Sequence, residues 1–204
     1  MTSLGGKYLY PDNILDITVS DIARHLGRVM RFAGAVDTWW TVLQHSLLVS
    51  DLVEQPDLTG AFTEPSRARA CLAALFHDAH EFITGDVPSP WKTPALRAQQ
   101  ENIDIQIATA LGLPRFSDAE LRVVKIADNI ALRLEAHTVA PTVCLVQPDK
   151  FGRAEDVEGL RGIIAKYWDP VPREGFMTTW YPDSKHVAEF IRRTHDLFDA
   201  VGKA

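Results

Sequence analysis

The sequence lacks several features that define large classes of protein. Its 204 residues include only two cysteines, Cys71 and Cys144, too few for a zinc ribbon or a secreted disulfide scaffold. No apolar run reaches the roughly 18 residues of a membrane span, and the first residues lack the basic-then-apolar pattern of a signal peptide, so we do not expect export. Basic residues are outnumbered, with 21 Lys and Arg against 27 Asp and Glu, which disfavours nucleic acids and anionic membranes as partners. We therefore expect a cytoplasmic protein with one domain over residues 1–204.

Helical periodicity dominates the rest of the sequence. Apolar residues recur at intervals of three and four, whereas the period of two that is typical of strands is confined to residues 142–146. Glycine and proline mark the first dozen residues as an irregular arm and residues 138–152 as a loop. The sequence predicts an all-α bundle of about seven helices, over residues 17–32, 41–55, 64–84, 95–111, 117–134, 154–168 and 184–201.

A polar cluster interrupts the third predicted helix. His77 and Asp78 directly follow the wholly apolar residues 71–76, and Glu81 comes one helical turn after His77. Burying a charged aspartate without a partner costs several kcal/mol, so a bound cation is the simplest explanation for Asp78. On the same face of the helix, Glu81 would reach a water molecule on that ion.

Two more potential ligands lie on other predicted helices. His45 stands between apolar residues of the second helix, and Asp128 lies in the mostly apolar fifth. Taken singly, a hydrogen-bonded core histidine and a surface acid are the commoner outcomes. Together with His77 and Asp78, they indicate one site of two imidazoles and two carboxylates. Such a mixed nitrogen and oxygen shell suits Mn, Co, Ni, Fe or Zn better than Mg or Ca.

The order of these motifs resembles that of the HD-domain metal-dependent phosphohydrolases. The segment FHDAHEFITGDVPSPWK, residues 76–92, is especially similar to the 5′-deoxynucleotidase, or YfbR-like, branch. Upstream, GRVMRFAGAVDTWWTVLQHSLLVS resembles a phage and bacterial subgroup that includes deoxyadenosine triphosphate triphosphohydrolases. The resemblance covers roughly residues 20–136 and implies an HD-domain helical bundle, with C-terminal helices over residues 154–201 added to it.

The resemblance also implies roles for individual residues. Glu81 corresponds to the acid that positions or activates the attacking water, and Arg31 to the arginine that orients the phosphate, with Arg28 one turn away as the alternative register. Lys125 corresponds to a position where a cation neutralises phosphate. The metal ligands correspond to His45, His77, Asp78 and Asp128, and the remaining substrate contacts to Phe32, Asp86, Val87, Pro88 and Ser89, with Asp86 on the sugar hydroxyl.

The other histidines favour a single divalent transition-metal ion. Relatives with two or three metals need additional histidines before the last aspartate, but none lies between His80 and His137. His80 is expected beside the site, His137 to point elsewhere, and His186 and His195 to face solvent. The pair Trp39 and Trp40 either anchors a loop on the core or stacks on a purine.

Two classes of function remain open from the sequence. The first is an enzyme that hydrolyses deoxynucleoside monophosphates to phosphate, or triphosphates to tripolyphosphate. Cations for a triphosphate could come from Arg28, Arg31, Lys92, Lys125 and Arg133. The second is a non-catalytic nucleotide-binding sensor, which the intact Glu81 and ligand set disfavour. A (p)ppGpp or cyclic-nucleotide hydrolase is a weaker enzymatic alternative. The family resemblance also implies a homodimer or a higher homo-oligomer.

Overall fold

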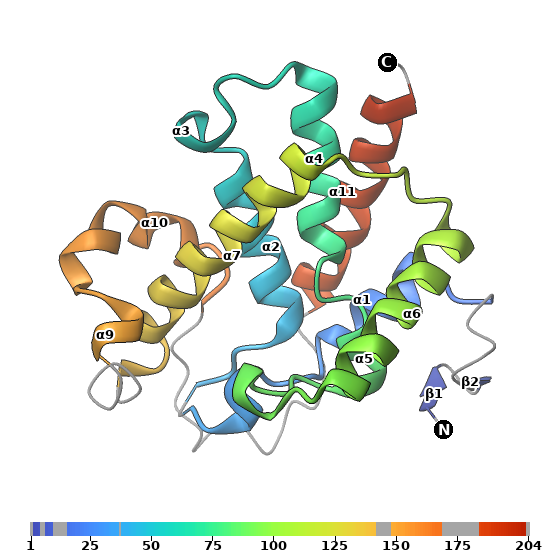
Figure 1. Cartoon of the computed structure of the whole chain (residues 1–204), viewed down its shortest axis with the longest axis horizontal. Helices are drawn as coiled ribbons and strands as arrows, with labels where there is room; N and C mark the ends of the chain where they lie inside the picture. Colours follow the sequence, from blue (N-terminus) through green and yellow to red (C-terminus); the bar gives the residue numbers. More distant parts are fainter. Residues whose placement is uncertain are drawn as a thin grey trace.

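The computed structural model describes residues 2–4, 7–9, 16–36, 38–141, 148–168 and 184–202. Its fold is all-α, as predicted, apart from one short antiparallel hairpin (Figure 1). The elements, in chain order, are β1 (Thr2–Leu4), β2 (Lys7–Leu9), α1 (Val19–Leu26), η1 (Arg31–Gly34), α2 (Val42–Val53), α3 (Pro56–Thr59), α4 (Glu64–Phe76), α5 (Glu81–Thr84), η2 (Ser89–Trp91), α6 (Pro94–Leu111), α7 (Asp118–Thr138), α9 (Pro148–Phe151), η3 (Ala154–Leu160), α10 (Arg161–Ile164) and α11 (Ser184–Gly202).

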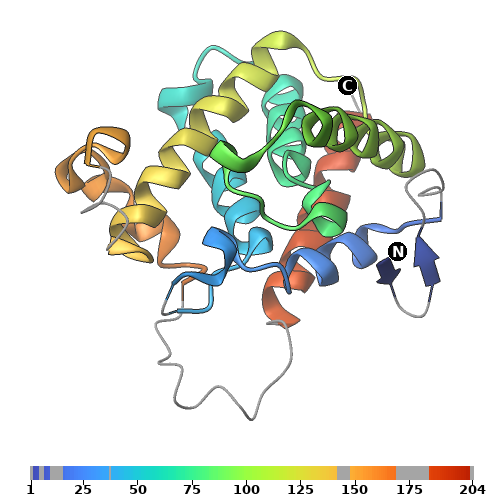
Figure 2. The same cartoon turned by 60° about the horizontal axis from the view of Figure 1, so that its bottom comes forward.

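Helix α2 forms the centre of the bundle. All twelve of its residues are buried, and it packs against α4, α7 and α11 (Figure 1). The turned view in Figure 2 shows α6 on the far side of α4 and α7 from α9 and α10. Burial of an entire helix is unusual for an amphipathic element, and it places any polar residue of α2 inside the protein.

Side-chain caps fix where the central helices begin. Thr41 caps α2 in a capping box with Gln44, and Ser117 caps α7 in the same way with Glu120. The start that the sequence predicts for this helix, at residue 117, is confirmed. Because α2 carries His45 and α7 carries Asp128, these caps help to fix the register of two of the four predicted metal ligands. The other two, His77 and Asp78, directly follow α4.

The predicted helix over residues 64–84 is in fact two helices. Helix α4 ends at Phe76, and α5 begins at Glu81. Between them, the N–H of Ala79 donates to the carbonyl of Phe76 and the N–H of Glu81 to that of Asp78, so the bonds span three residues rather than four. Gly85, at φ +71°, then turns the chain out of α5.

Other parts of the prediction also need correction. The N-terminal arm contains the hairpin of β1 and β2, and the short helix α3, which begins at Pro56, was not predicted. The region 154–168 is a 3₁₀-helix followed by the single turn α10. The expected loop at 138–152 contains α9, while residues 142–146, with their period of two, lie outside the described residues.

None of the helices in the described part of the chain combines the length and the apolar character needed to cross a bilayer.

Candidate metal centre

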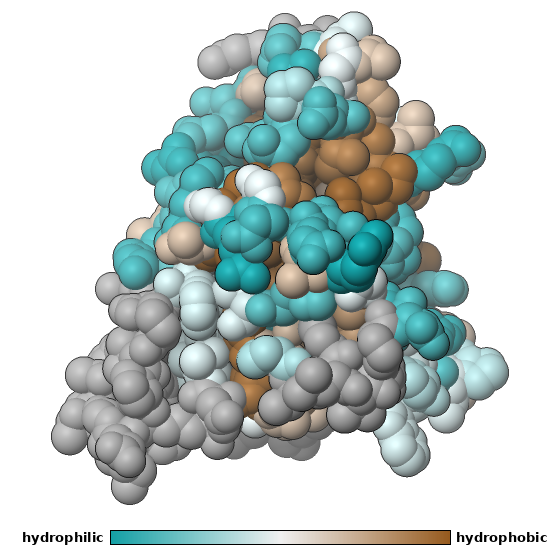
Figure 3. Space-filling view, turned by 90° about the vertical axis from the view of Figure 1, so that its left-hand side faces the viewer, coloured by the Kyte–Doolittle hydropathy of each residue, from teal (hydrophilic) through white to brown (hydrophobic). Residues whose placement is uncertain are grey.

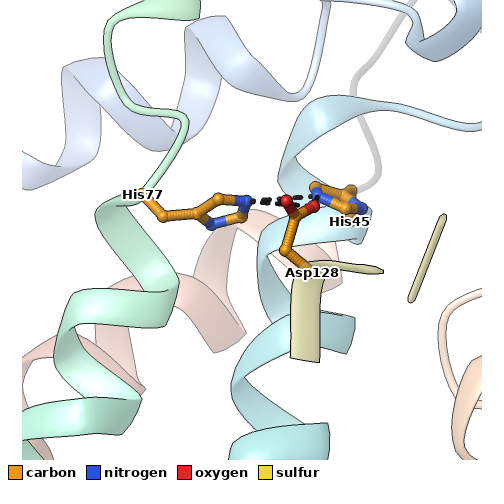
Figure 4. Close-up of side chains that lie close together, drawn as sticks. All are labelled: His45, His77 and Asp128. Carbon is orange, nitrogen blue, oxygen red and sulfur yellow. Dashed lines mark hydrogen bonds and ion pairs between the residues drawn. The ribbon is translucent and has the colours of Figure 1, made fainter. Parts of the chain in front are cut away.

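Four polar side chains meet at one point inside the bundle. The Nε2 atom of His45 lies 3.2 Å from Nε2 of His77 and 3.3 Å from Oδ1 of Asp128 (Figure 4). Asp78 joins them, with Oδ2 at 3.3 Å from Nε2 of His77 and 3.6 Å from that of His45. The structure therefore brings together all four residues that the sequence singles out as metal ligands, and we call this group the metal centre.

The fold supplies these side chains from three places. His45 lies in the first turn of α2, and Asp128 lies in the middle of α7. His77 and Asp78 occupy the turn where α4 ends, so the break in the predicted third helix delivers both neighbouring side chains to the same point. In a continuous helix, adjacent side chains would diverge by about 100°.

Hydrogen bonds fix the orientation of both imidazole rings. Nδ1 of His77 lies 2.8 Å from the carbonyl oxygen of Ala74, and Nδ1 of His45 lies 2.6 Å from Oε1 of Glu135. A proton on each Nδ1 satisfies these acceptors and leaves each Nε2 with a lone pair directed into the centre. This arrangement is the usual support for a metal-bound histidine.

The charges of the centre call for a cation. Burial acts to lower the pKa of His77, but Asp78 and Asp128 raise it well above its ordinary value. Burial likewise acts to raise the pKa of Asp128, yet the imidazoles of His45 and His77 hold it far below its usual range. In the chain alone, protons on the imidazoles must balance the carboxylates. A divalent transition metal provides the same positive charge and matches the two-nitrogen, two-oxygen donor set.

Glu135 is a site residue that sequence reasoning missed. It is fully buried, and besides accepting from His45 it accepts a hydrogen bond from Nε1 of Trp40 at 2.9 Å and one from Arg31 at 3.2 Å. The sequence does hold a signal for it, since position 135 follows Asp128 by two helical turns and so shares its face of α7. A charged residue on that otherwise apolar face needs a partner, and His45 and Arg31 are its partners.

Glu81 lies beside the centre in a buried position. Its side chain is 1% exposed, its Oε1 atom lies 3.4 Å from Nζ of Lys92, and no described residue pairs with its Oε2. Burial, together with the negative charges of Asp78 and Asp86, raises the pKa of Glu81 to about 8. In its deprotonated form, a carboxylate with so high a pKa and one free oxygen is a stronger base than an ordinary glutamate and is suited to accept a proton from a water molecule.

The loop after α5 is held against the turn before α2. Oδ2 of Asp86 accepts the backbone N–H of Phe32 at 2.9 Å and lies 3.5 Å from the guanidinium of Arg31. Phe32 and Ala33 adopt φ +55° and +51°, a region that disfavours non-glycine residues and that clusters at functional sites. Burial acts to lower the pKa of Arg31, but Glu135 and Asp86 raise it, so this arginine stays charged.

The remaining predicted substrate contacts are more exposed. Lys125 is 70% exposed, and its Nζ lies 2.8 Å from Oδ2 of Asp128. Arg28 is exposed, and the described interactions connect it to none of the four central residues. Val87 is partly buried, whereas Pro88 and Ser89 are exposed at the start of η2.

The other histidines and tryptophans divide between core and surface. His80 lies next to Glu81 and hydrogen-bonds Asp104 through Nδ1, in agreement with a place beside the site. His137 binds the carbonyl of Phe151, and His195 is exposed, both as predicted. The prediction for His186 was wrong, because its ring is buried and packs 5.8 Å from that of Tyr167. Trp40 is fully buried, which favours the anchoring role over stacking on a purine.

Comparisons with known proteins agree with this architecture. No family model matches the chain. The chain is 36% identical over 195 residues to an uncharacterized protein of Rhodobacter capsulatus, covering 92% of this chain and 88% of that protein. It is 35% identical over 137 residues to the uncharacterized protein YfdR of Escherichia coli K12, covering 65% of this chain and 68% of YfdR.

A solved structure shows the same fold. The HD phosphohydrolase DatZ of cyanophage S-2L, in complex with dA and one catalytic Zn²⁺ ion, aligns with a TM-score of 0.51 over 92% of this chain and 99% of that one, at 19% identity. The chain therefore belongs to the family of the Rhodobacter capsulatus protein and YfdR, and it has the HD-domain fold.

Proposed function

We propose that the protein is a metal-dependent phosphohydrolase that cleaves the 5′-phosphoester of deoxynucleotides. The observation that carries this proposal is the convergence of two oriented imidazoles and two carboxylates next to the buried Glu81. The neighbour DatZ supports the substrate class, since it was solved with a deoxynucleoside and a catalytic metal on the same fold.

His45, His77, Asp78 and Asp128 would hold one divalent transition-metal ion, with Mn, Co, Zn, Ni and Fe preferred over Mg by the donor set. When bound, such an ion polarises a phosphoryl oxygen and lowers the pKa of a bound water molecule.

Glu81 supplies the base. Its free Oε2 accepts the proton of the attacking water, whose oxygen forms a new bond to phosphorus while the bond from phosphorus to the ester oxygen breaks. The departing oxygen takes up a proton from solvent, which leaves a deoxynucleoside and inorganic phosphate. Lys92, at 3.4 Å from Oε1, keeps the carboxylate in place during this transfer.

Arg31 and Lys125 offset the charge of the phosphate. Both lie against carboxylates of the site, at 3.9 Å from Asp78 for Arg31 and 2.8 Å from Asp128 for Lys125. One of the other cations considered for a longer phosphate chain, Arg133, instead pairs with Asp156, and the described interactions connect Arg28 to none of the four central residues. The charge distribution thus favours a monophosphate over a triphosphate, and with it a 5′-deoxynucleotidase.

A product assay tests the proposal. Metal-stripped protein is resupplied with Mn²⁺, Co²⁺, Zn²⁺ or Mg²⁺ and given each dNMP, dNTP and ribonucleotide, with orthophosphate and tripolyphosphate measured separately. We expect orthophosphate from dNMPs. Release of tripolyphosphate from a dNTP would keep deoxynucleotides as the substrate class but show that the substrate is a triphosphate rather than a monophosphate. Metal-loaded protein that is inactive on every deoxynucleotide would contradict the proposal and favour a nucleotide sensor or another phosphoester.

A further inference from the structure

A second cluster of polar side chains lies beside the metal centre, and one of its members, His80, has no part in the proposed reaction. A ring nitrogen of His80 and one carboxylate oxygen each of Asp78 and Glu81 lie within 4.8 Å of one another. His80 is 8% exposed and Glu81 is 1% exposed, so both are buried. The cluster thus places a buried histidine next to the proposed base.

Helix α6 holds this part of the chain through two side chains. Nδ1 of His80 lies 3.0 Å from Oδ2 and 3.1 Å from Oδ1 of Asp104, and Nε2 of Gln100 donates to Oγ1 of Thr84 at 3.1 Å. Because Gln100 and Asp104 are one helical turn apart, they share a face of α6. Both ends of the segment that runs from His80 to Thr84, and that includes Glu81, are therefore fixed by the same helix.

Burial of apolar side chains alone does not explain why α6 turns Asp104 towards His80. The buried residues of α6 are Gln100, Ile103 and Ile107, which lie on the same face as Asp104. Ile105, in contrast, is 66% exposed. Large apolar side chains thus remain on the surface of this protein, as the patch at the upper right of Figure 3 also shows. The helix exposes an isoleucine while two polar residues face α5, which indicates that these two polar contacts are specific.

Two buried atoms of the cluster, Nε2 of His80 and Oε2 of Glu81, pair with no described residue. When Nδ1 donates its proton to Asp104, the neutral ring of His80 has a lone pair at Nε2, so both of these atoms are hydrogen-bond acceptors. Buried polar atoms are normally satisfied by protein or by water, and a water molecule can donate to two acceptors at once. Two acceptors that share one water lie about 4.6 Å apart, which is comparable to the 4.8 Å that contains the cluster.

We propose that Nε2 of His80 and Oε2 of Glu81 together hold the water molecule that attacks phosphorus, and that Asp104 positions the His80 ring for this contact. This proposal rests on the proposed function, because it concerns the water of that reaction.

Each hydrogen of the water then has a separate fate. The proton held by Glu81 passes to its carboxylate as the water oxygen bonds to phosphorus and the bond from phosphorus to the ester oxygen breaks. The hydrogen held by His80 stays on the oxygen and leaves with the phosphate, so His80 gains no proton. With both hydrogens held, the lone pairs of the water point away from the two acceptors and towards the substrate, which favours attack by fixing the orientation of the water.

Two substitutions of His80 separate the contact with water from the contact with Asp104. His80→Asn keeps an amide donor near the position of Nδ1 but has no acceptor at the position of Nε2, whereas His80→Gln has an amide that reaches the position of Nε2. His137→Asn is the control, since His137 hydrogen-bonds the carbonyl of Phe151 instead, at 3.3 Å.

The metal-loaded proteins are assayed on the deoxynucleotide that the wild type cleaves best. We expect kcat to fall by about 100-fold in His80→Asn, with KM unchanged because the contact acts in the transition state. His80→Gln should recover most of this loss, and His137→Asn should match the wild type. A wild-type kcat in His80→Asn, or no recovery in His80→Gln, would overturn the proposal. So would loss of bound metal in His80→Asn, because His80 would then act through the metal centre.

A crystal structure of the metal-loaded wild-type protein separates this proposal from the proposed function, because it needs no turnover. We expect an ordered water at about 2.7–3.2 Å from both Nε2 of His80 and Oε2 of Glu81. Such a water would support the site even if no deoxynucleotide is cleaved, whereas an active protein without it would overturn only the present proposal. A second metal ion bound by Asp78, His80 and Glu81 would also overturn it. Nitrogen NMR should show the proton of the His80 ring on Nδ1, and a proton on Nε2 would contradict the role as acceptor.

Discussion

Helix α2 contributes to two buried charged groups that are built on opposite principles. Near its start, His45 enters the metal centre; near its end, Asp51 enters a second group, which we call the Asp51 network. In that network, Oδ2 of Asp51 accepts hydrogen bonds from Lys166 at 2.8 Å and from the Tyr167 hydroxyl at 2.9 Å, and Oδ1 accepts one from Arg193. The chain itself thus neutralises Asp51.

The metal centre is neutralised in a different way. In the chain alone, its carboxylates are balanced by protons on the imidazoles and by two cations, Arg31 at 3.9 Å from Asp78 and Lys125 at 2.8 Å from Asp128. Protons on imidazoles can be exchanged for a metal ion, whereas the arginine, lysine and tyrosine partners of Asp51 cannot. The Asp51 network therefore joins α2 to α11, and the proposal that an ion binds applies to the metal centre alone.

The largest expected effect is a loss of catalytic rate with no loss of bound metal. Glu81→Gln keeps the shape of the side chain but removes the base, so kcat should fall by about 10²–10⁴-fold. Metal content, measured by elemental analysis, should stay at the wild-type level because Glu81 is not one of the four ligands. An unchanged kcat would remove Glu81 from the mechanism.

A pair of substitutions contrasts the two groups directly. Asp51→Asn leaves Arg193 without its buried partner and should lower the free energy of unfolding by about 3 kcal/mol, with metal content unchanged. Asp128→Asn should show the reverse, with loss of metal and little loss of stability in the metal-free protein. Urea unfolding and elemental analysis on both variants check this pattern. If Asp51→Asn also released the metal, the two groups would not be independent.

A smaller effect is expected for the support of His45. Glu135→Gln retains an acceptor for the imidazole but loses the charge that orients it and pairs with Arg31. Metal affinity should weaken by about 10–100-fold, the usual effect of changing such a partner. Competition with a chelator of known affinity measures the change, and an unaltered affinity would reduce Glu135 to a packing role.

The smallest effect concerns acid stability next to the Asp51 network. Hydrogen bonds from Arg192 and Arg193 lower the pKa of Glu189 from 4.5 to about 2. Since the folded state has the lower pKa, this stabilisation is present above pH 4.5 and is lost as the pH falls towards 2. Because both arginine pairs are partly exposed to solvent, this stabilisation should be only about 0.5–1 kcal/mol. Unfolding of Glu189→Gln should therefore differ from wild type at neutral pH and converge with it near pH 2.

Sequence reasoning reached the fold class and the set of four central residues because both depend on local patterns. Helical periodicity marks most of the helices, and an apolar run that ends in His77 and Asp78 is conspicuous on its own. The break between α4 and α5 was missed, since nothing in the periodicity of residues 64–84 distinguishes a turn with three-residue hydrogen bonds from a continuous helix.

The residues that were missed act over long distances in the chain. Glu135 meets His45 across 90 residues, and the burial of His186 depends on its contact with the ring of Tyr167. Tertiary contacts of this kind leave little trace in local sequence. The sequence could have predicted that Glu135 lies near the site, because its spacing from Asp128 places both residues on one face of α7.

A titration of metal-stripped protein with Co²⁺, followed by visible absorption, tests the central claim most directly. We predict one equivalent bound per chain, with a spectrum of mixed nitrogen and oxygen ligands that is lost in Asp128→Asn and kept in Asp51→Asn. Absence of Co²⁺ binding by the wild-type chain, or an equal signal in both variants, would contradict the assignment of His45, His77, Asp78 and Asp128 as a metal centre.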